Sequence, residues 1–411
     1  MINQPTAKIL LGITGGIAAY KSAVLARLLI KAGCQVRVMM TPSACEFITP
    51  LTLQALTGHA VHTTLLDETA ELGMGHIELA KWADVLVIAP ASANTIAKLA
   101  CGMADNLLTT VCLASTAPVL LAPAMNQAMY SHLATQHNLT KLQNFGYHLL
   151  SPDSGEQACG DVGAGRLPEP EDLCERILAF IARRTLPQSL HDKTMVITAG
   201  ATLEPIDPVR FLSNHSTGKM GFALAVACRD MGANVILISG SRVVLPTPFG
   251  VSRLNVGTAD DMLKACLSAM HTADIFIATA AVADYKVTQI ATQKIKKTTD
   301  NDELTLQLTK NPDILATVAK AYPQALMVGF AAETQDTESY AQSKLISKNL
   351  DMIACNDVSD TSIGFGSDDN AMTVFFAKDY GRDSLKLAKA PKSQIAVQLV
   401  QAAAELFAAK S

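Results

Sequence analysis

Short runs of apolar residues alternate with longer amphipathic segments along most of the chain. In the first half, each apolar run ends at a turn signal, and the segments between the runs repeat apolar residues at helical spacing. Strands that are apolar throughout are typical of parallel sheets, which helices cover on both faces. The pattern therefore predicts such a sheet. Its expected strands are KILLGIT, CQVRVMM, DVLVIAP and PVLLAP, and two expected helices span 17–33 and 43–58.

The same opening occurs twice in the chain. Residues 8–29 and 194–226 each read as a buried strand, a polar loop with glycine and a helix, which is how α/β nucleotide-binding units begin. The strand pattern then resumes with ANVILISG, DIFIATA, ALMVGFAA and DMIACN, and a charged join with one proline at 183–193 separates the halves. We therefore expect two Rossmann-like, doubly wound α/β domains, 1–188 and 189–411, and two sites.

Composition narrows the class of protein. The 411 residues suffice for two or three domains, and 49% hydrophobic residues can fill cores of that size. A net charge of −4 gives no indication of a nucleic-acid partner. The nine cysteines include no C-x-x-C pair, which favours reduced thiols. Because we find no signal peptide and no apolar run of roughly 18–20 residues that could span a membrane, we expect a cytoplasmic protein.

Polar residues of the first half follow the predicted strands at their carboxyl ends, where such sheets bind ligands. The first loop is not G-x-G-x-x-G, and the second strand ends without an acidic residue, so a dinucleotide is disfavoured. Hydroxyl and amide groups at helix starts suit a single phosphate, although ordinary helix capping explains each of them alone. The candidate residues are Thr14, Gly15, Gly16, Thr41, Ser92, Asn94 and Thr95.

Three further polar residues of the first half are candidates for chemistry: His76, Asn126 and Cys159. A lone histidine or cysteine is more often structural. Cys159, however, lies in the glycine-rich stretch 155–165, whose composition we expect in the interior of neither a helix nor a strand. We interpret this stretch as a mobile flap that closes over a site.

The first half resembles the flavin-dependent cysteine decarboxylases, in particular phosphopantothenoylcysteine decarboxylase. The resemblance rests on GITGGIAAYK, TPSA, GHIELA, PASANT, GMADNLL, PAMNQAM and ACGDVGAGR, and it departs at Tyr130, where the family has Trp. It implies a flavodoxin-like fold, and bound FMN that stores electrons while CO₂ leaves the substrate. By the same resemblance, Gly15, Gly16, Thr41, Ser92, Asn94 and Thr95 hold FMN, Asn126 and Met129 contact the substrate, His76 is catalytic, and Cys159 is the acid on the flap.

The second half offers several candidates for a nucleotide site. The stretch 213–220 resembles a P-loop at first sight, but it lacks the leading glycine, and Met220 cannot bind magnesium. Asn311 followed by Pro312 predicts the cap and first residue of a helix, whose free N–H groups could hold phosphate. Lys344 and Lys348 share one helix face. Each lysine alone is also explained as a solvated surface charge.

This half resembles phosphopantothenate–cysteine ligase through ITAGATLEPIDPVRFLSNHSTGKMG, ATAAVADYK, KIKK, KNPDIL and VGFAAET. The resemblance implies CTP with Mg²⁺, whose ligands in this chain are unknown, and an acyl-cytidylate that the cysteine amine attacks. Arg210 and Asn214 fall in the segment that handles this intermediate. The implied CTP contacts are Ala278, Thr279, Ala280, Asp284, Lys294, Asn311, Pro312, Asp313, Ile314, Phe330, Lys344 and Lys348.

Taken together, the two resemblances imply two consecutive steps of coenzyme A biosynthesis. The expected partners are 4′-phosphopantothenate, cysteine and CTP, with neither nucleic acid nor membrane. A homo-oligomer is also implied, with trimers of the flavin domain and dimers of the ligase domain, which together permit a dodecamer. Two alternatives stay open. A two-domain nicotinamide oxidoreductase is disfavoured by the missing acidic residues, and a flavin-binding regulatory protein is disfavoured by the presence of Cys159, His76 and Asn126.

Overall fold

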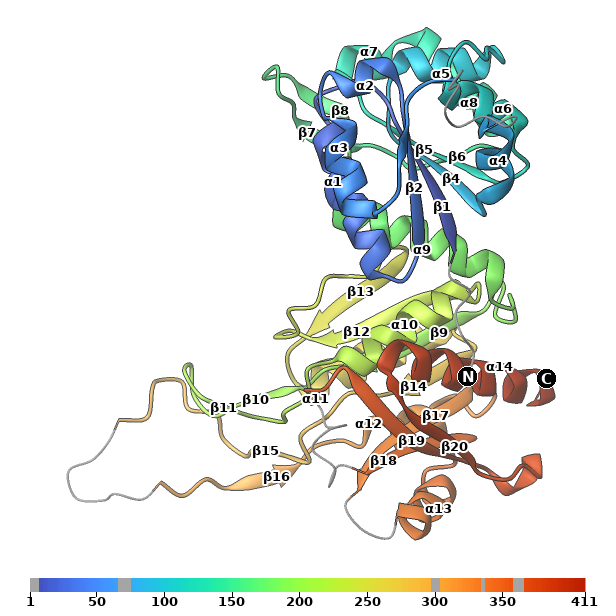
Figure 1. The fold of residues 1–411 in the computed structure, drawn as a ribbon. Helices are drawn as coiled ribbons and strands as arrows, with labels where there is room; N and C mark the ends of the chain where they lie inside the picture. Colours follow the sequence, from blue (N-terminus) through green and yellow to red (C-terminus); the bar gives the residue numbers. More distant parts are fainter. Residues whose placement is uncertain (1–6, 66–74, 297–303, 334–336, 358–365, 411) are drawn as a thin grey trace. The chain divides into compact units, whose positions relative to one another are not determined.

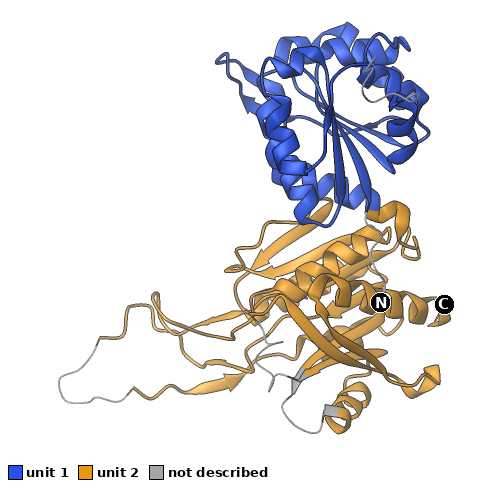
Figure 2. Cartoon of the chain, in the orientation of Figure 1, with its two compact units in different colours: residues 1–181 blue, residues 182–411 orange. Residues whose placement is uncertain are grey.

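The computed structural model describes residues 7–65, 75–296, 304–333, 337–357 and 366–410 (Figure 1). The chain divides into two compact units, residues 1–181 and residues 182–411 (Figure 2). Each unit has its own sheet and its own hydrophobic cores. Within the described ranges, no helix combines the length and the apolarity that a membrane crossing requires.

Unit 1 is built on a parallel sheet in the order β3-β2-β1-β4-β5-β6. Without the two-residue β3, this is the order of a flavodoxin-like fold, as expected. The chain order reverses between β1 and β4, so polar loops after these two strands open into the same crevice. The strands are β1 (Lys8–Ile13), β2 (Gln35–Met40), β3 (Val61–His62), β4 (Val85–Ala91), β5 (Val119–Pro123) and β6 (His148–Leu149).

Helices cover both faces of this sheet because successive side chains of each strand point to opposite sides. Ile9 and Leu11 pack on the face of α1 and α9, whereas Leu10 packs on the face of α4, α5, α6 and α8. Each such buried side chain contributes roughly 1.5–3 kcal/mol. The helices are α1 (Ala19–Lys31), α2 (Pro42–Cys45), α3 (Pro50–Thr57), α4 (Gly75–Trp82), α5 (Ala93–Ala100), α6 (Leu107–Ala114), α7 (Gln127–Ser131), α8 (Leu133–Asn144) and α9 (Pro170–Thr185).

The glycine-rich stretch around Cys159 forms an antiparallel hairpin of β7 (Asp153–Glu156) and β8 (Val162–Arg166), so our expectation that it lies outside strands was wrong. The glycines permit close approach to the start of α7 and to the residues just before it. A Cβ at Gly163 would lie 2.8 Å from the Cβ of Gln127, and one at Gly165 would lie 2.5 Å from the carbonyl oxygen of Met125. Composition therefore reflects packing here, and Cys159 lies in the turn of the hairpin.

Unit 2 has an eight-stranded sheet in the order β13-β12-β9-β14-β17-β18-β19-β20. The first six of these are parallel and follow the Rossmann order, with reversal between β9 and β14, and β19 and β20 add antiparallel strands at one edge. The strands are β9 (Thr194–Ala199), β12 (Asn234–Gly240), β13 (Val251–Val256), β14 (Ile275–Ala278), β17 (Leu326–Glu333), β18 (Met352–Asp357), β19 (Asp369–Phe376) and β20 (Leu385–Pro391).

Helices again cover both faces of this sheet. One core lies against α10 and α14 and the other against α11, α12 and α13. Two small antiparallel ladders, β10–β11 and β15–β16, are in contact through β10 and β15 (Figure 1). The remaining elements are α10 (Lys219–Asp230), α11 (Ala259–Ala269), α12 (Ile314–Ala321), α13 (Thr337–Ser347), α14 (Lys392–Lys410), β10 (Leu203–Pro205), β11 (Phe211–Ser213), β15 (Tyr285–Val287), β16 (Leu308–Lys310) and the 3-10 turns Met270–Thr272 and Lys378–Tyr380.

Candidate functional site

Polar residues follow β1 and β4 at their carboxyl ends, where the chain order of unit 1 reverses, and we call this group the first rim. The buried Thr14 hydroxyl donates to the Pro90 carbonyl at 2.8 Å and accepts from the Ser92 amide at 2.9 Å. Ser92 in turn caps α5, since its hydroxyl accepts from the Thr95 amide at 3.3 Å. Capping by Ser92 is therefore present, and the same turn places the hydroxyl groups of Ser92 and Thr95 3.2 Å apart.

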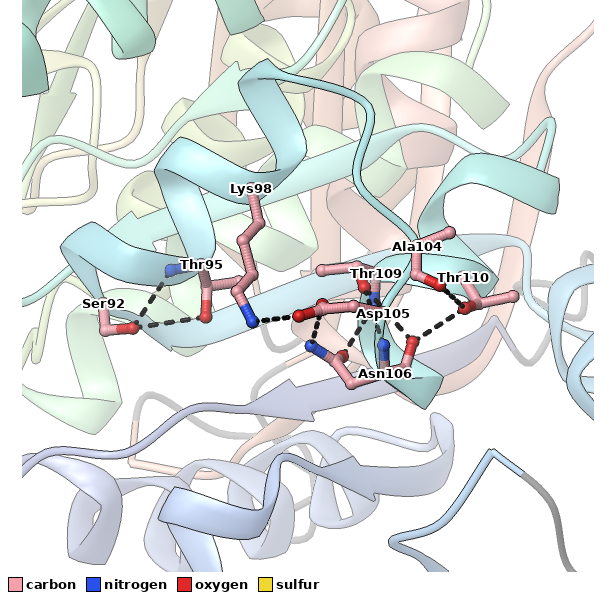
Figure 3. Close-up of polar contacts among 8 residues, drawn as sticks. All are labelled: Ser92, Thr95, Lys98, Ala104, Asp105, Asn106, Thr109 and Thr110. Atoms are coloured by element: carbon pink, nitrogen blue, oxygen red, sulfur yellow. Dashed lines mark hydrogen bonds and ion pairs between the residues drawn. The ribbon is translucent and has the colours of Figure 1, made fainter.

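The segment after α5 is joined to this helix by a side-chain contact (Figure 3). Lys98 on α5 pairs with Asp105 at 2.5 Å, and this hydrogen bond, opposed by desolvation, holds the pKa of Asp105 below its usual value. Asn106 and Thr109 form a capping box at the start of α6. The GMADNLL stretch thus ties the end of α5 to the start of α6, which orients the α5 helix that carries Ser92.

Gly15 and Gly16, in the loop after β1, differ in the space around them. A Cβ at Gly15 would lie 2.5 Å from the Cβ of Ser43, so glycine is needed there for the approach of α2. A Cβ at Gly16 would meet no protein atom within 4 Å. Open space beside a glycine, next to a rim of hydroxyl groups, fits a bound phosphate group. Thr41 caps the neighbouring α2, accepting from the Ala44 amide at 3.3 Å.

His76 lies in the first turn of α4, and residues 66–74 before it lie outside the described part. The helix is anchored by Arg37 on β2, whose guanidinium pairs with Glu78 at 3.1 Å and lies 4.6 Å from the centroid of the Trp82 ring. This anchoring positions the start of α4. Among the described contacts, none joins His76 to Asn126 or Cys159.

Asn126 and Cys159 lie together, although they are far apart in the sequence. The Asn126 side-chain amide donates to the Cys159 sulfur at 3.3 Å and to Asp161 Oδ2 at 2.7 Å, and the thiol donates to the same oxygen at 3.5 Å. Asp161, which we did not single out from the sequence, is thus the third member of this cluster. Met129 on α7 is half exposed (50%), so its side chain is free to contact a substrate.

The hairpin is held to the start of α7 by Gln157. Its side chain donates to the Met125 carbonyl at 3.1 Å and accepts from the Gln127 amide at 2.9 Å, and the Met125 amide donates to the Gly165 carbonyl at 2.9 Å. These bonds explain how Cys159 in the turn reaches Asn126.

A second rim surrounds a cavity of about 720 Å³ in unit 2, beside the carboxyl ends of β9 and β14. It is lined by every CTP contact expected from the sequence except Lys294. Lys294 is exposed, in the segment after β15. The predicted residues that the cavity brings together are Ala278, Thr279, Ala280, Asp284, Asn311, Pro312, Asp313, Ile314, Phe330, Lys344 and Lys348.

The cavity also has a wall that sequence reasoning missed. One group of these residues is the loop and helix start that resemble a P-loop, and a second group comes from β18, β19 and the start of α14. The weak P-loop likeness was a usable signal for the first group, whereas nothing in the sequence connected the second group to this site. These residues are Ser216, Thr217, Gly218, Lys219, Met220, Asn356, Asn370, Met372 and Lys392.

The start of α12 differs from our prediction. Asp313 is the cap, accepting from the Ala316 amide at 3.0 Å, whereas we expected Asn311 in that role. The reason is that the Asn311 amide donates to the Ala283 carbonyl at 2.8 Å. Its Oδ1 is buried and has no partner in the described structure, so it is an acceptor available to a ligand with a donor group.

Asp313 also pairs with Lys348 at 2.8 Å. Partial burial alone would raise the pKa of Asp313, but the Lys348 hydrogen bond and nearby backbone amides lower it below its usual value. The carboxylate therefore stays ionised, and it ties the start of α12 to α13.

Arg210 and Asn214 flank β11 in the sequence and make different contacts. Arg210 binds the buried Asp207 at 2.5 Å and the Ile295 carbonyl at 2.9 Å, and its hydrogen bond to Asp207 strongly lowers the pKa of that carboxyl. Arg210 thus supports the segment that carries Lys294. Asn214 donates to the Ala281 carbonyl at 3.2 Å and lines a second hollow of about 390 Å³, which shares Ser216 with the first cavity.

Both halves match known protein families. Residues 190–406 match the family described as DNA/pantothenate metabolism flavoprotein C-terminal domain, and residues 2–182 match the family described as Flavoprotein. A curated protein of Vibrio cholerae, "Coenzyme A biosynthesis bifunctional protein CoaBC", is 55% identical over 92% of this chain and 94% of its own. The protein of the same name from Escherichia coli is 52% identical over 90% of each chain.

Among solved structures, the crystal structure of the C-terminal domain of a protein with that name is 34% identical, covers 54% of this chain and 98% of its own, and has a TM-score of 0.46. The identity to the curated relatives extends over both units. The chain therefore belongs to the family of bifunctional coenzyme A biosynthesis proteins.

Proposed function

We propose that this chain performs two consecutive steps of coenzyme A biosynthesis, one in each unit. Unit 2 joins cysteine to 4′-phosphopantothenate at the expense of CTP, and unit 1 decarboxylates the product to 4′-phosphopantetheine. The observation that carries the assignment for unit 2 is the 720 Å³ cavity, whose size is that of a small-molecule site and whose wall gathers the expected nucleotide contacts from distant segments.

In unit 2, CTP would occupy this cavity at the β9–β14 reversal. The free Oδ1 of Asn311 needs a hydrogen-bond donor, and both the amino group of cytosine and the ribose hydroxyls are donors. Lys344 on α13 and Lys348 just after its end supply positive charge. Magnesium would enter with the nucleotide, since this ion is usually bound by substrate phosphates and one or two carboxylates.

The acyl transfer would occur between the two hollows. Attack of the 4′-phosphopantothenate carboxylate on the α-phosphate of CTP forms the acyl-cytidylate and expels pyrophosphate, and the cysteine amine then displaces CMP. The hollow beside Asn214 adjoins the nucleotide cavity through Ser216, so it would hold the acyl part. Asn214 would donate to the anhydride, and Arg210 would keep the Lys294 segment in place.

In unit 1, FMN would bind at the first rim, with its phosphate at Gly16, Ser92, Asn94 and Thr95. When bound, FMN supplies reversible storage of two electrons. The open space beside Gly16 and the hydroxyl groups at the start of α5 fit this group. Thr41 and Gly15 would shape the opposite side of the rim through α2.

The cluster at the hairpin would handle the substrate of unit 1. Asn126 would bind the substrate carboxylate through its amide, Met129 would contact the apolar part, and Cys159 would supply the proton that completes the product after CO₂ leaves. His76 would act from the start of α4. The hairpin holds Cys159 within hydrogen-bond distance of Asn126, so both side chains would contact the same substrate molecule.

The flavin units would form trimers and the ligase units dimers, which together permit a dodecamer. We propose a cytoplasmic location, in which the nine free cysteines would stay reduced.

Two glycine substitutions test the flavin site. Gly16→Val should lower flavin affinity about tenfold or more without changing the melting temperature of the apoprotein, because a Cβ there meets no protein atom within 4 Å and would enter space that FMN would use. Gly15→Ala is the contrast, and should lower the melting temperature of the apoprotein because its Cβ collides with Ser43. Flavin titration and thermal unfolding measure both. Normal flavin binding by Gly16→Val would exclude this loop as the FMN site.

The two-step function is tested with cysteine labelled at its carboxyl carbon. The purified chain, given 4′-phosphopantothenate, CTP and Mg²⁺, should release one labelled CO₂ and one CMP for each 4′-phosphopantetheine formed. Omission of CTP should abolish the labelled CO₂, because decarboxylation needs the ligated product. Release of label without CTP would contradict this order of steps.

A further inference from the structure

Two lysines from different helix starts lie close together on the wall of the nucleotide cavity. Lys219 begins α10 and Lys392 begins α14, and both line the cavity. The Lys219 ammonium donates to the Gly366 carbonyl at 3.0 Å and pairs with Asp368 at 2.7 Å, while the Lys392 ammonium donates to the carbonyl of Ser367, the residue between those two. One short segment therefore holds both ammonium groups in the same region.

This arrangement places two like charges in a partly desolvated region. Lys392 is only 7% exposed. Burial first, and repulsion by Lys219 second, lower the pKa of Lys392 below its usual value, although Asp368 and Asp369 oppose the shift. The Asp368 carboxylate that pairs with Lys219 is largely exposed (89%), so water screens much of its charge. An anion in the cavity would relieve this repulsion.

Hydrogen-bond donors face the same region from the start of α10. The residue before this helix, Gly218, has a left-handed backbone (φ +81°), and no side chain caps the helix. The first residues of α10, Lys219 to Gly221, line the cavity with Gly218. Gly221 packs so closely on β9 that a Cβ there would lie 2.5 Å from the Cβ of Ala199. The helix start is thus held beside the strand ends where the nucleotide is proposed to bind.

We propose that Lys219 and Lys392 form the subsite for the outer two phosphates of CTP, the pair that leaves as pyrophosphate. This subsite rests on the proposed ligase function of unit 2. Two adjacent cations with backbone N–H donors beside them bind a diphosphate better than they bind an anion with a single charge. Three other lysines line the cavity, Lys310, Lys344 and Lys348, and Lys348 is paired with Asp313 at the start of α12. Neutralising the leaving pyrophosphate would also assist formation of the acyl-cytidylate.

The test compares CTP with CMP, which lacks the outer two phosphates. The unmodified full-length chain, Lys219→Met and Lys392→Met are each titrated with CTP and with CMP in a calorimeter, at one salt and Mg²⁺ concentration. The titrations give the affinity of each protein for each nucleotide. Each variant should bind CTP at least tenfold more weakly and CMP within twofold of the unmodified chain. Lys219→Arg should retain most of the CTP affinity, since it keeps the charge.

Lys386→Met is the matched control, because this exposed lysine of β20 lies outside the cavity wall and its loss should change neither affinity. Equal weakening of CTP and CMP would overturn the subsite, as would unchanged CTP affinity in Lys219→Met and Lys392→Met. A higher KM for 4′-phosphopantothenate with unchanged CTP affinity would assign the lysines to the other phosphate instead. Absence of CTP binding by the unmodified chain would refute the proposed ligase function itself. Because Lys219 is partly exposed, Lys219→Met keeps the test valid if Lys392→Met does not fold.

Discussion

Replacing Cys159 by serine should lower formation of 4′-phosphopantetheine by about 10²–10⁴-fold while FMN binding and release of CO₂ continue. The thiol lies in the turn of the β7–β8 hairpin and contacts Asn126 and Asp161, where it can protonate the decarboxylated substrate. A serine hydroxyl is nearly as large but is a far weaker acid. FMN would hold two electrons taken from the substrate before CO₂ leaves. The ene-thiol left by decarboxylation, which needs those electrons and a proton to become 4′-phosphopantetheine, should therefore accumulate.

Mass spectrometry of the product pool, together with measured CO₂, tests this result for Cys159→Ser. Cys101→Ser is the matched control, since Cys101 is an exposed thiol at the end of α5 in the same unit and should be dispensable. A normal yield of 4′-phosphopantetheine from Cys159→Ser would remove Cys159 from its role as the acid.

Replacing Asn214 by aspartate should slow formation of the amide by about 10²–10³-fold. CTP and 4′-phosphopantothenate should still react with each other, giving the acyl-cytidylate and pyrophosphate. The side-chain amide is a donor at the edge of the hollow proposed for the acyl part, and it contacts the Ala281 carbonyl. A carboxylate cannot donate and would repel both that carbonyl and the anhydride. The acyl-cytidylate should accumulate in the presence of cysteine.

The measurement is the ratio of acyl-cytidylate to phosphopantothenoylcysteine over time. Ser213→Ala serves as the control for a loosened loop, because it removes the hydrogen bond to the Thr202 carbonyl and leaves the Asn214 donor intact. Its ratio should stay that of the unmodified chain. An Asn214→Asp variant that forms the amide at the normal rate would show that Asn214 does not contact the anhydride.

The sheets could be predicted because their strands are apolar throughout, and this places the following polar residues at the strand ends. Thr14 and Ser92 follow β1 and β4, which the topology sets side by side. The cap of α12 could not be predicted in the same way. Asn311 and Asp313 are both good caps, and the choice depends on the Ala283 carbonyl, a residue far away in sequence that engages the Asn311 amide.

The same limit applies to the parts of the sites that come from distant segments. Lys392 begins a helix at the far end of the chain, and only the antiparallel strands β19 and β20 place it on the cavity wall. Asp161 was overlooked because its role depends on the hairpin that sets it beside Asn126. The glycines of that hairpin suggested a loop, since close packing and chain mobility both favour glycine.

The central claim is that each unit contains a complete site, and separate expression of the units tests it most directly. We divide the chain after Thr185, where α9 ends. Gln188 then stays in the same fragment as Asp230, whose carbonyl accepts a hydrogen bond from the Gln188 side chain at 2.9 Å. Residues 1–185 should bind FMN and release labelled CO₂ from supplied phosphopantothenoylcysteine, and residues 186–411 should make that compound from 4′-phosphopantothenate, CTP and cysteine without flavin. A folded ligase fragment that stays inactive until the flavin fragment is added would contradict the claim, because it would show that the units share a site.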